Sequence, residues 1–243
     1  MKPSKNPKFK RSPAGRQGGR RVGVQNPKVF IIVGPPGSGK GTQAKLLCQK
    51  FGLEYVGSGD TLRARQKIGD FTGKKLIQAM GRGELAPSFV IVKILGDVLE
   101  NFKKHLKIRG FVLDGWTRII FEAILADEAL EWYEWDKNVK VILLNISRRE
   151  SYNRLTKRRQ CKKCGHLIPW IGEFKKLKKC DKCGGELITR ADDKMESIKK
   201  RLEEYKNQTK KAINYYKKQG RLIEINGGQS IEDVFKDILK AIK

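Results

Sequence analysis

The sequence has no long apolar run and very little histidine. None of its apolar stretches approaches the roughly 18 residues that a membrane-spanning helix needs, and the basic N-terminus lacks the apolar segment of a secretory signal. These absences argue against a membrane-spanning or secreted protein, and we expect a cytoplasmic location. Of the two histidines, His105 has no partner pattern, so we assign it no role.

Acidic residues are scarce relative to basic ones. The chain has 26 Asp and Glu against 53 Lys and Arg, which gives a formal net charge of +27. Such an excess attracts phosphate-bearing ligands and favours nonspecific contact with nucleic acid. Repulsion between molecules of this charge also favours a monomer.

Residues 1–26 contain no acidic residue at all. They hold eight Lys or Arg, three prolines and four glycines, a composition that cannot bury enough apolar surface to become ordered. We therefore predict a disordered basic tail. Two interpretations stay open: a solubilising extension, which we prefer, and an arm that contacts RNA weakly through counterion release.

Residues 34–43 read GPPGSGKGTQ and stand between an apolar run at 29–33 and a helical pattern through Ala44, Leu46 and Leu47. Glycines let successive N–H groups turn inward at a helix start, where the helix dipole favours an anion, and Lys40 adds a full positive charge. A flexible linker would need neither the strand before it nor the helix after it. The segment is therefore predicted to be a phosphate-binding loop for a nucleoside triphosphate.

Three further apolar runs, at 111–113, 139–146 and 222–225, alternate with helical patterns. Helical periodicity is clearest at 90–99, 198–205 and 231–239, and Ser230 can cap the last of these. This alternation is typical of buried parallel strands with helices on both faces of the sheet. We predict an α/β protein with a P-loop NTPase fold and one small inserted lobe at 157–190.

The predicted lobe contains four of the five cysteines, as two Cys-x-x-Cys pairs with fifteen residues between them. This spacing strongly indicates a tetrathiolate zinc site formed by Cys161, Cys164, Cys180 and Cys183. Two disulfides are a weak alternative in a reducing cytoplasm, whereas ferrous iron suits the same ligands. Four protein thiolates leave no open position for substrate, so we expect a structural metal.

Two other residues near these motifs are given lesser roles. His166 adjoins the first cysteine pair but exceeds the number of ligands that zinc needs. Cys48 lies on the helix after the phosphate loop, and we expect it to be a buried core residue rather than a reactive thiol.

Several motifs in order resemble the adenylate kinase family of nucleoside monophosphate kinases. Besides 34–43, in which Gly41 follows Lys40 where most phosphate loops have Ser or Thr, they are SGDTLR at 58–63, GFVLDGWTR at 110–118, and the arginine-rich segments 154–159 and 189–193 that flank the cysteines. The resemblance runs from Val29 to the C-terminus, about nine-tenths of the chain. It implies the long form of the family, whose mobile lid carries zinc.

The resemblance also implies a division of the chain into parts. Residues 27–156 would form the core, with a clamp for the acceptor nucleotide at about 57–90. Residues 157–190 would form the zinc-binding lid, and 191–243 the rest of the core. Closure of the lid would exclude water from the donor phosphates and so prevent hydrolysis.

The resemblance further implies roles for individual residues. The predicted ATP-binding residues are Gly37, Ser38, Gly39, Lys40, Gly41, Thr42, Arg154 and Arg158. The predicted AMP-binding residues are Ser58, Arg63, Ala86, Arg118, Glu122, Arg190 and Arg201. The predicted catalytic residues are Lys40, Arg118, Arg158, Arg190 and Arg201, because arginine binds phosphate oxygens in two places and stays charged. Asp60 and Asp114 would fix the waters of a nucleotide-bound Mg²⁺, since Gly41 supplies no hydroxyl. For each charged residue, a solvated helix face is the alternative.

Two departures from the family pattern bear on the acceptor base. Trp116 and Thr117 replace the usual Phe-Pro before Arg118, so a rigid proline turn is lost. Glu122 stands where adenylate kinases have a glutamine that binds the AMP base. An ionised carboxylate only accepts hydrogen bonds, which suits the two donors of guanine, whereas a protonated Glu122 would suit adenine.

The leading functional prediction is therefore transfer of a phosphoryl group from Mg-ATP to AMP, giving two ADP. A kinase of the same fold that accepts GMP or a pyrimidine nucleotide comes next. An RNA-associated ATPase, in which the cysteine knuckles and the basic tail bind RNA, is a third and weaker alternative, because a nucleotide switch would not require the full set of arginines.

Overall fold

The computed structural model describes residues 27–243 except 106–107 and 191. The basic tail predicted at 1–26, with its suggested RNA contact, lies outside these described residues. Within the part of the chain that is described, no helix combines the length and the apolar character that crossing a membrane requires.

A five-stranded, fully parallel sheet forms the centre of the molecule, in the order β2-β3-β1-β4-β8. Its strands are β1 (Lys28–Val33), β2 (Glu54–Gly57), β3 (Gly110–Asp114), β4 (Val139–Asn145) and β8 (Leu222–Asn226). Four of them confirm the apolar runs seen in the sequence. The edge strand β2 was not predicted, because its only buried apolar side chain is that of Val56.

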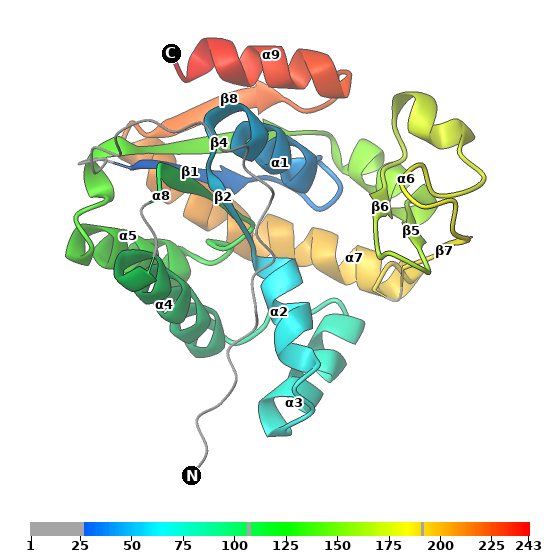
Figure 1. The fold of residues 1–243 in the computed structure, drawn as a ribbon, viewed down its shortest axis with the longest axis horizontal. Helices are drawn as coiled ribbons and strands as arrows, with labels where there is room; N and C mark the ends of the chain where they lie inside the picture. Colours follow the sequence, from blue (N-terminus) through cyan, green and yellow to red (C-terminus); the bar gives the residue numbers. More distant parts are fainter. Residues whose placement is uncertain (1–26, 106–107, 191) are drawn as a thin grey trace.

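Both faces of the sheet are buried, as an α/β fold requires. Ile31 faces a cluster built with α4 (Ser88–His105), α5 (Ile120–Trp132) and α8 (Lys210–Lys218). Ile32 faces the opposite cluster, built with α1 (Lys40–Phe51) and α9 (Ile231–Ala241), of which α9 lies along the top of the view in Figure 1. Both isoleucines are 0% exposed, and each such side chain contributes about 1.5–3 kcal/mol to folding.

The remaining helices surround the end of the sheet where the strands terminate. They are α2 (Ser58–Gln66), α3 (Phe71–Gly81), α6 (Arg148–Lys157) and α7 (Met195–Glu204), which continues through a π-helical turn, Tyr205–Thr209, into α8. The helical patterns at 90–99, 198–205 and 231–239 are confirmed, and Ser230 Oγ accepts a hydrogen bond from Asp233 N at 3.1 Å as the cap of α9. Helices α2, α3, α5, α6 and α8 were not predicted individually.

A small lobe is inserted between α6 and α7. It is a three-stranded antiparallel sheet of β5 (Arg159–Cys161), β6 (Leu167–Ile168) and β7 (Leu187–Ile188), in the order β6-β5-β7. In Figure 1 this lobe lies at one side of the central sheet, while α2 and α3 lie below it. The two units flank the mouth of the site described next.

Candidate active site

The predicted phosphate loop joins β1 to the first turn of α1. Gly39 is the N-cap of α1 and has φ +94°, a conformation that glycine adopts without steric cost. Lys40 Nζ donates to the carbonyls of Gly34 and Pro35 at 2.9 and 2.8 Å. Ser38 Oγ is buried and has no hydrogen-bond partner among the described residues. A phosphate group at this helix start would meet unpaired N–H groups and an unused hydroxyl.

The surroundings of Lys40 disfavour its protonated, positively charged form. Burial lowers its pKa to about 7, Asp114 opposes this shift, and the positive charges of Arg118, Arg201 and Arg158 add to it. An anion bound beside Lys40 would offset the effects of burial and of the neighbouring arginine charges on its pKa. The electrostatics of the loop therefore favour a polyphosphate ligand.

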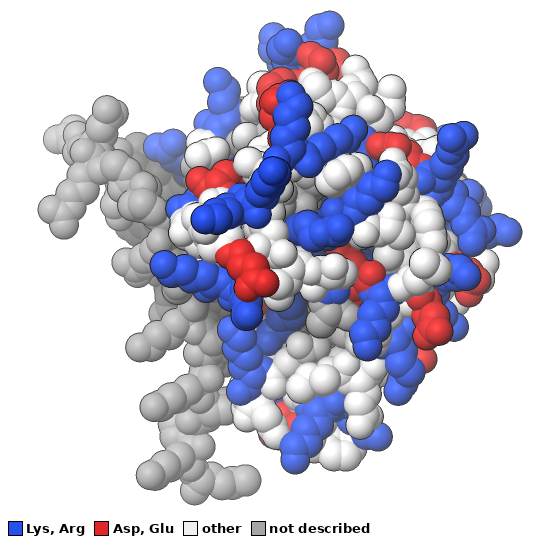
Figure 2. Space-filling model, turned by 90° about the vertical axis from the view of Figure 1, so that its right-hand side faces the viewer, with Lys and Arg blue, Asp and Glu red and all other residues white. Residues whose placement is uncertain are grey.

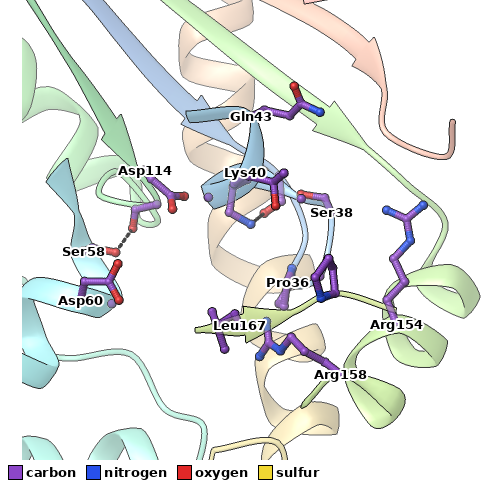
Figure 3. A pocket seen from close by; sticks show the side chains of 18 of the residues that line it. Pro36, Ser38, Lys40, Gln43, Ser58, Asp60, Asp114, Arg154, Arg158 and Leu167 are labelled. Atoms are coloured by element: carbon purple, nitrogen blue, oxygen red, sulfur yellow. Dashed lines mark hydrogen bonds between the residues drawn. The ribbon is translucent and has the colours of Figure 1, made fainter. Parts of the chain in front are cut away.

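A cavity of about 850 Å³ opens from this loop and extends beneath the cysteine lobe, a size typical of small-molecule sites. Of the residues predicted to bind nucleotide or magnesium, all except Glu122 line it. Figure 3 shows Asp60 and Asp114 on one side, Arg154 and Arg158 on the other, and Lys40 between them. The structure thus brings together residues that lie up to 164 positions apart in the sequence, from Gly37 to Arg201.

A buried carboxylate organises two of the cavity's arginines. Asp193, whose side chain is 0% exposed, accepts hydrogen bonds from Arg158 at 2.8 and 2.6 Å and from Arg201 at 2.9 Å. Arg158 comes just after α6 and Arg201 belongs to α7, so this carboxylate joins the two helices that carry the lobe. Burial lowers the pKa of both arginines, and each keeps further N–H donors for a ligand.

Other arginines of the cavity are held in a similar way. Arg190 is paired with Asp192, and Arg63 with Asp60 at 2.6 Å. Arg118 Nε donates to the carbonyl of Gly115 at 2.8 Å. Fixed guanidinium groups of this kind lose little side-chain entropy when a phosphate binds.

Asp60 and Asp114 lie close enough to share a third residue, Tyr55. The Tyr55 hydroxyl is 2.9 Å from Asp114 Oδ2 and 3.4 Å from Asp60 Oδ2. Burial raises the pKa of Asp114, and Lys40 opposes that shift. Burial also acts to raise the pKa of Asp60, but the hydrogen bond and charge of Arg63, together with the charges of Lys45 and Arg190, lower it overall. Two carboxylates at the phosphate loop are a donor set that suits a hydrated Mg²⁺. A Cβ at Gly41 would lie only 3.1 Å from Asp114 Oδ2, so the glycine in place of the usual hydroxyl residue leaves room for this carboxylate.

Glu122 is placed differently from the other predicted site residues. It is 3% exposed in the first turn of α5, and its Oε2 accepts from the backbone N–H groups of Arg118 and Ile119 at 2.9 and 3.2 Å. Burial raises its pKa, and these two N–H groups oppose the shift. Its carboxylate thus satisfies the start of a helix, and its contact with an acceptor base stays a prediction.

The segment that lacks the family's proline is held by burial instead. Trp116 is 1% exposed, and its indole N–H donates to the carbonyl of Val56 at 2.8 Å. This bond ties the loop after β3 to the neighbouring strand β2. The tryptophan therefore restricts the turn before Arg118, a task that a proline would perform through its fixed φ.

The four cysteines of the lobe converge as their spacing predicted. Their Sγ atoms all lie within 4.8 Å of one another, with 3.4 Å between Cys161 and Cys183 and 3.6 Å between Cys164 and Cys180. Ligands of tetrahedral Zn²⁺ at about 2.3 Å would be roughly 3.8 Å apart, so the cluster fits that ion. Cys48 is only partly buried, but it packs against the core, and burial raises its pKa to about 12, so its thiol is not activated.

Tyr55, Asp192 and Asp193 are functional candidates to which sequence reasoning gave no role. Nothing in the residues around Tyr55 marks a contact with two acids that lie further along the chain. Asp192 and Asp193 were part of a recognised motif, but their pairing with arginines from several elements depends on the fold.

The fold and the cavity define a P-loop nucleotide-binding enzyme of the phosphotransferase type. A parallel sheet, a phosphate loop at a helix start, two acids and several partly free arginines around one cavity suit phosphoryl transfer, which depends on positioning and charge neutralisation rather than on a covalent intermediate.

Comparison with known proteins identifies the family. The model of the family described as adenylate kinase matches residues 32–221. The adenylate kinase of Archaeoglobus fulgidus is 40% identical over 213 residues, which cover 86% of this chain and 95% of that protein. Those of Thermodesulfovibrio yellowstonii and Methanocella arvoryzae are 41% and 40% identical, over 86% and 88% of this chain and 96% and 98% of theirs. The chain belongs to the adenylate kinase family and is a nucleoside monophosphate kinase, which confirms the resemblance seen in the sequence.

Proposed function

We propose that the protein catalyses reversible transfer of the terminal phosphoryl group of Mg-ATP to AMP, giving two ADP. The observation that carries this proposal is the convergence of Lys40 and six arginines from several elements on the cavity of the phosphate loop. A site that only bound and hydrolysed ATP would not need so many phosphate-binding side chains. The family relatives, named adenylate kinases, support the same reaction.

In this proposal the two nucleotides occupy opposite ends of the cavity. The donor lies on the phosphate loop, with Arg154 near its base and Arg158 near its phosphates. The acceptor lies toward α2 and Ala86, where Arg63 and Arg118 hold its phosphate. Arg190 and Arg201 would neutralise the group in transit, because both line the cavity and arginine binds phosphate oxygens in two places.

Two metals belong to the proposal. A nucleotide-bound Mg²⁺ would supply positive charge at the donor phosphates, and Asp60 and Asp114 would hold its waters. A structural Zn²⁺ on the four cysteines would stabilise the lobe, which has little core of its own. Movement of this lobe as a lid over both nucleotides would exclude water from the reaction.

The test is turnover of Mg-ATP with AMP, GMP, CMP and UMP in parallel, and without acceptor, with each nucleotide product separated and counted. Two ADP formed for each AMP consumed are expected. Slow ATP hydrolysis that ignores every acceptor would contradict the proposal and favour the RNA-associated ATPase.

GMP is the second candidate acceptor, and Glu122 is the observation that favours it. An ionised carboxylate at this position matches the two donors on the edge of guanine. We nevertheless favour AMP, because the carboxylate would have to give up its two backbone hydrogen bonds to reach a base. We also propose that the protein is cytoplasmic and monomeric.

A further inference from the structure

Tyr55 lies between the two acids of the site although it belongs to neither of their segments. It is the second residue of β2, whereas Asp60 is in the first turn of α2 and Asp114 ends β3. Its hydroxyl reaches Asp114 Oδ2 at 2.9 Å and Asp60 Oδ2 at 3.4 Å. Because a phenol has one proton to donate, the shorter contact to Asp114 is the stronger hydrogen bond.

The Tyr55 side chain occupies the space that a side chain at Gly57 would otherwise fill. Tyr55 and Gly57 are two positions apart on β2, so they face the same side of the sheet. A Cβ at Gly57 would lie 2.4 Å from the Tyr55 hydroxyl oxygen and 2.8 Å from Cζ. Gly57 has φ −92° and ψ 119°, an ordinary extended conformation, so the backbone itself does not require glycine there. The phenol accounts for the glycine.

A second glycine borders the same group. A Cβ at Gly41 would lie 3.1 Å from Asp114 Oδ2 and 3.6 Å from the Tyr55 hydroxyl. The ammonium group of Lys45 lies 5.4 Å from the centre of the Tyr55 ring, within the range of a cation–π contact. The ring is therefore confined on several sides, with its hydroxyl directed at the carboxylates.

A neutral donor at this position has an electrostatic advantage. Two carboxylates that approach the same group repel each other, and a lysine or arginine between them would hold them together only by cancelling their charge. A phenol hydroxyl orients a carboxylate without neutralising it. The hydroxyl itself therefore takes no charge from either acid, although Asp60 is also paired with Arg63.

We infer that Tyr55 is a positioning residue that orients Asp114, and more weakly Asp60, for the hydrated divalent cation of the donor nucleotide, and that the glycine at position 57 leaves room for the tyrosine side chain. This inference rests on the proposed function, because it assumes that the acids serve a nucleotide-bound cation. It extends that function from the two acids to the residue that orients them.

The first test compares nucleotide binding with and without the cation. The affinity of β,γ-methylene ATP is measured by calorimetry, with Mg²⁺ and in its absence, for the wild-type protein and for Tyr55→Phe. The variant is expected to weaken binding of the Mg²⁺-loaded analogue about three- to tenfold, while binding of the metal-free analogue changes less than about twofold. Equal changes in both forms, or no change in either, would overturn the inference.

The matched control is Tyr133→Phe. The Tyr133 hydroxyl also donates to a carboxylate, that of Glu100, but it does not line the cavity. This variant loses the same type of hydrogen bond and is expected to bind both forms of the analogue like the wild type. A shift equal to that of Tyr55→Phe would show a general loss of stability and would overturn the assignment to Tyr55.

The second test concerns Gly57 and uses a double-mutant cycle. Gly57→Ala is expected to displace the phenol and to weaken binding of the Mg²⁺-loaded analogue by a factor similar to that of Tyr55→Phe. In a Tyr55→Ala background, where the space is empty, the same Gly57→Ala change should have little further effect. An equal effect of Gly57→Ala in both backgrounds would overturn the claim that the glycine serves the tyrosine.

Failure of this inference is distinguishable from failure of the proposed function. A wild-type protein that transfers phosphoryl groups, together with a Tyr55→Phe variant of unchanged cation preference, would remove the inference alone. A wild-type protein without transferase activity would remove the proposed reaction. The ratio of the two binding constants would still test Tyr55, because it is measured with an inert nucleotide.

Discussion

The ammonium group of Lys40 is buried near three arginines and Asp114, and these surroundings should make nucleotide binding depend on pH. Burial and the neighbouring arginines lower its pKa to about 7 without a ligand. A bound polyphosphate stabilises the protonated form and raises that pKa. At a pH between the pKa of Lys40 without ligand and its higher pKa with ligand, nucleotide binding therefore takes up a proton. The affinity should fall as the pH rises above 7 and should level off below 7.

We predict uptake of close to one proton when β,γ-methylene ATP binds at about pH 8. The measurement is calorimetry in two buffers of different ionisation enthalpy. In Lys40→Met the uptake should disappear. A binding enthalpy that is the same in both buffers for the wild-type protein would contradict the assignment.

For Glu122, whose carboxylate accepts hydrogen bonds at the start of α5, we expect an effect on stability rather than on the choice of acceptor. In Glu122→Gln the side chain keeps an acceptor but loses its charge at a helix N-terminus. We expect the free energy of unfolding to fall by about 0.5–2 kcal/mol, measured by urea denaturation, with AMP still preferred over GMP in the turnover assay. A change of acceptor preference would show instead that Glu122 contacts the base.

Asp193 connects the end of α6 to α7 through its side chain. Its fully buried carboxylate holds Arg158 and Arg201, which come from the two helices that carry the lobe. Asp193→Asn would leave two guanidinium groups close together in a site that is already strongly positive. We expect a loss of about 2–4 kcal/mol in the free energy of unfolding, together with reduced turnover.

The matched control for this change is Asp97→Asn. Asp97 pairs with Lys93 along the exposed face of α4, and both side chains are more than half exposed. Its loss should change the free energy of unfolding by less than about 1 kcal/mol. Equal losses for both variants would show that burial of the Asp193 group is not what matters.

We expect the cysteine lobe to depend on a metal held by its four cysteines, of which Cys161 and Cys180 are buried and Cys164 is exposed. Its strands are two or three residues long, too short for a stable sheet without other support. Cys180→Ser is expected to lower bound zinc from about one ion per chain to a small fraction and to expose the lobe to proteases, with the central sheet still folded. Cys48→Ser, outside the cluster, should keep its zinc. Metal content by atomic spectroscopy and limited proteolysis are the measurements, and an intact, metal-free lobe in the wild-type protein would contradict the prediction.

At the scale of the whole molecule, positive charge is distributed well beyond the cavity. Figure 2 shows Lys and Arg side chains across the face that carries the lobe, with fewer acidic groups among them. The described residues that line the cavity, however, all lie between Val33 and Val234. The catalytic site and the basic N-terminal segment are therefore separate in sequence.

A variant that lacks residues 1–26 should keep kcat and both KM values within about twofold of the full chain. If the segment contacts RNA, the same deletion should weaken retention on immobilised RNA at low salt, with a smaller salt dependence of binding. A large loss of turnover in the deleted protein would mean that the segment takes part in the reaction.

Much of the architecture could be predicted from local sequence, whereas most of the roles expected of the site residues came from the resemblance to a family. Four strands coincide with short, mainly apolar runs, and α9 carries its own serine cap, so short-range patterns were sufficient for these elements. Strand β2 escaped prediction because its pairing with β3 supplies what its composition lacks. The start of α5 was not predicted, because the hydrogen bonds from its first N–H groups to Glu122 depend on the local backbone. The contact of Glu122 with an acceptor base stays a prediction.

The sequence by itself determined the phosphate loop and the cysteine cluster. Both are built from contiguous residues or from paired short motifs, whose glycines and ligands need only their own backbone to take position. The tertiary structure alone decided that Tyr55 meets Asp60 and Asp114, that Asp193 joins Arg158 to Arg201, and that Trp116 anchors the turn before Arg118. These contacts join residues on different strands and helices, and their strength depends on burial that exists only once the sheet and its covering helices have packed.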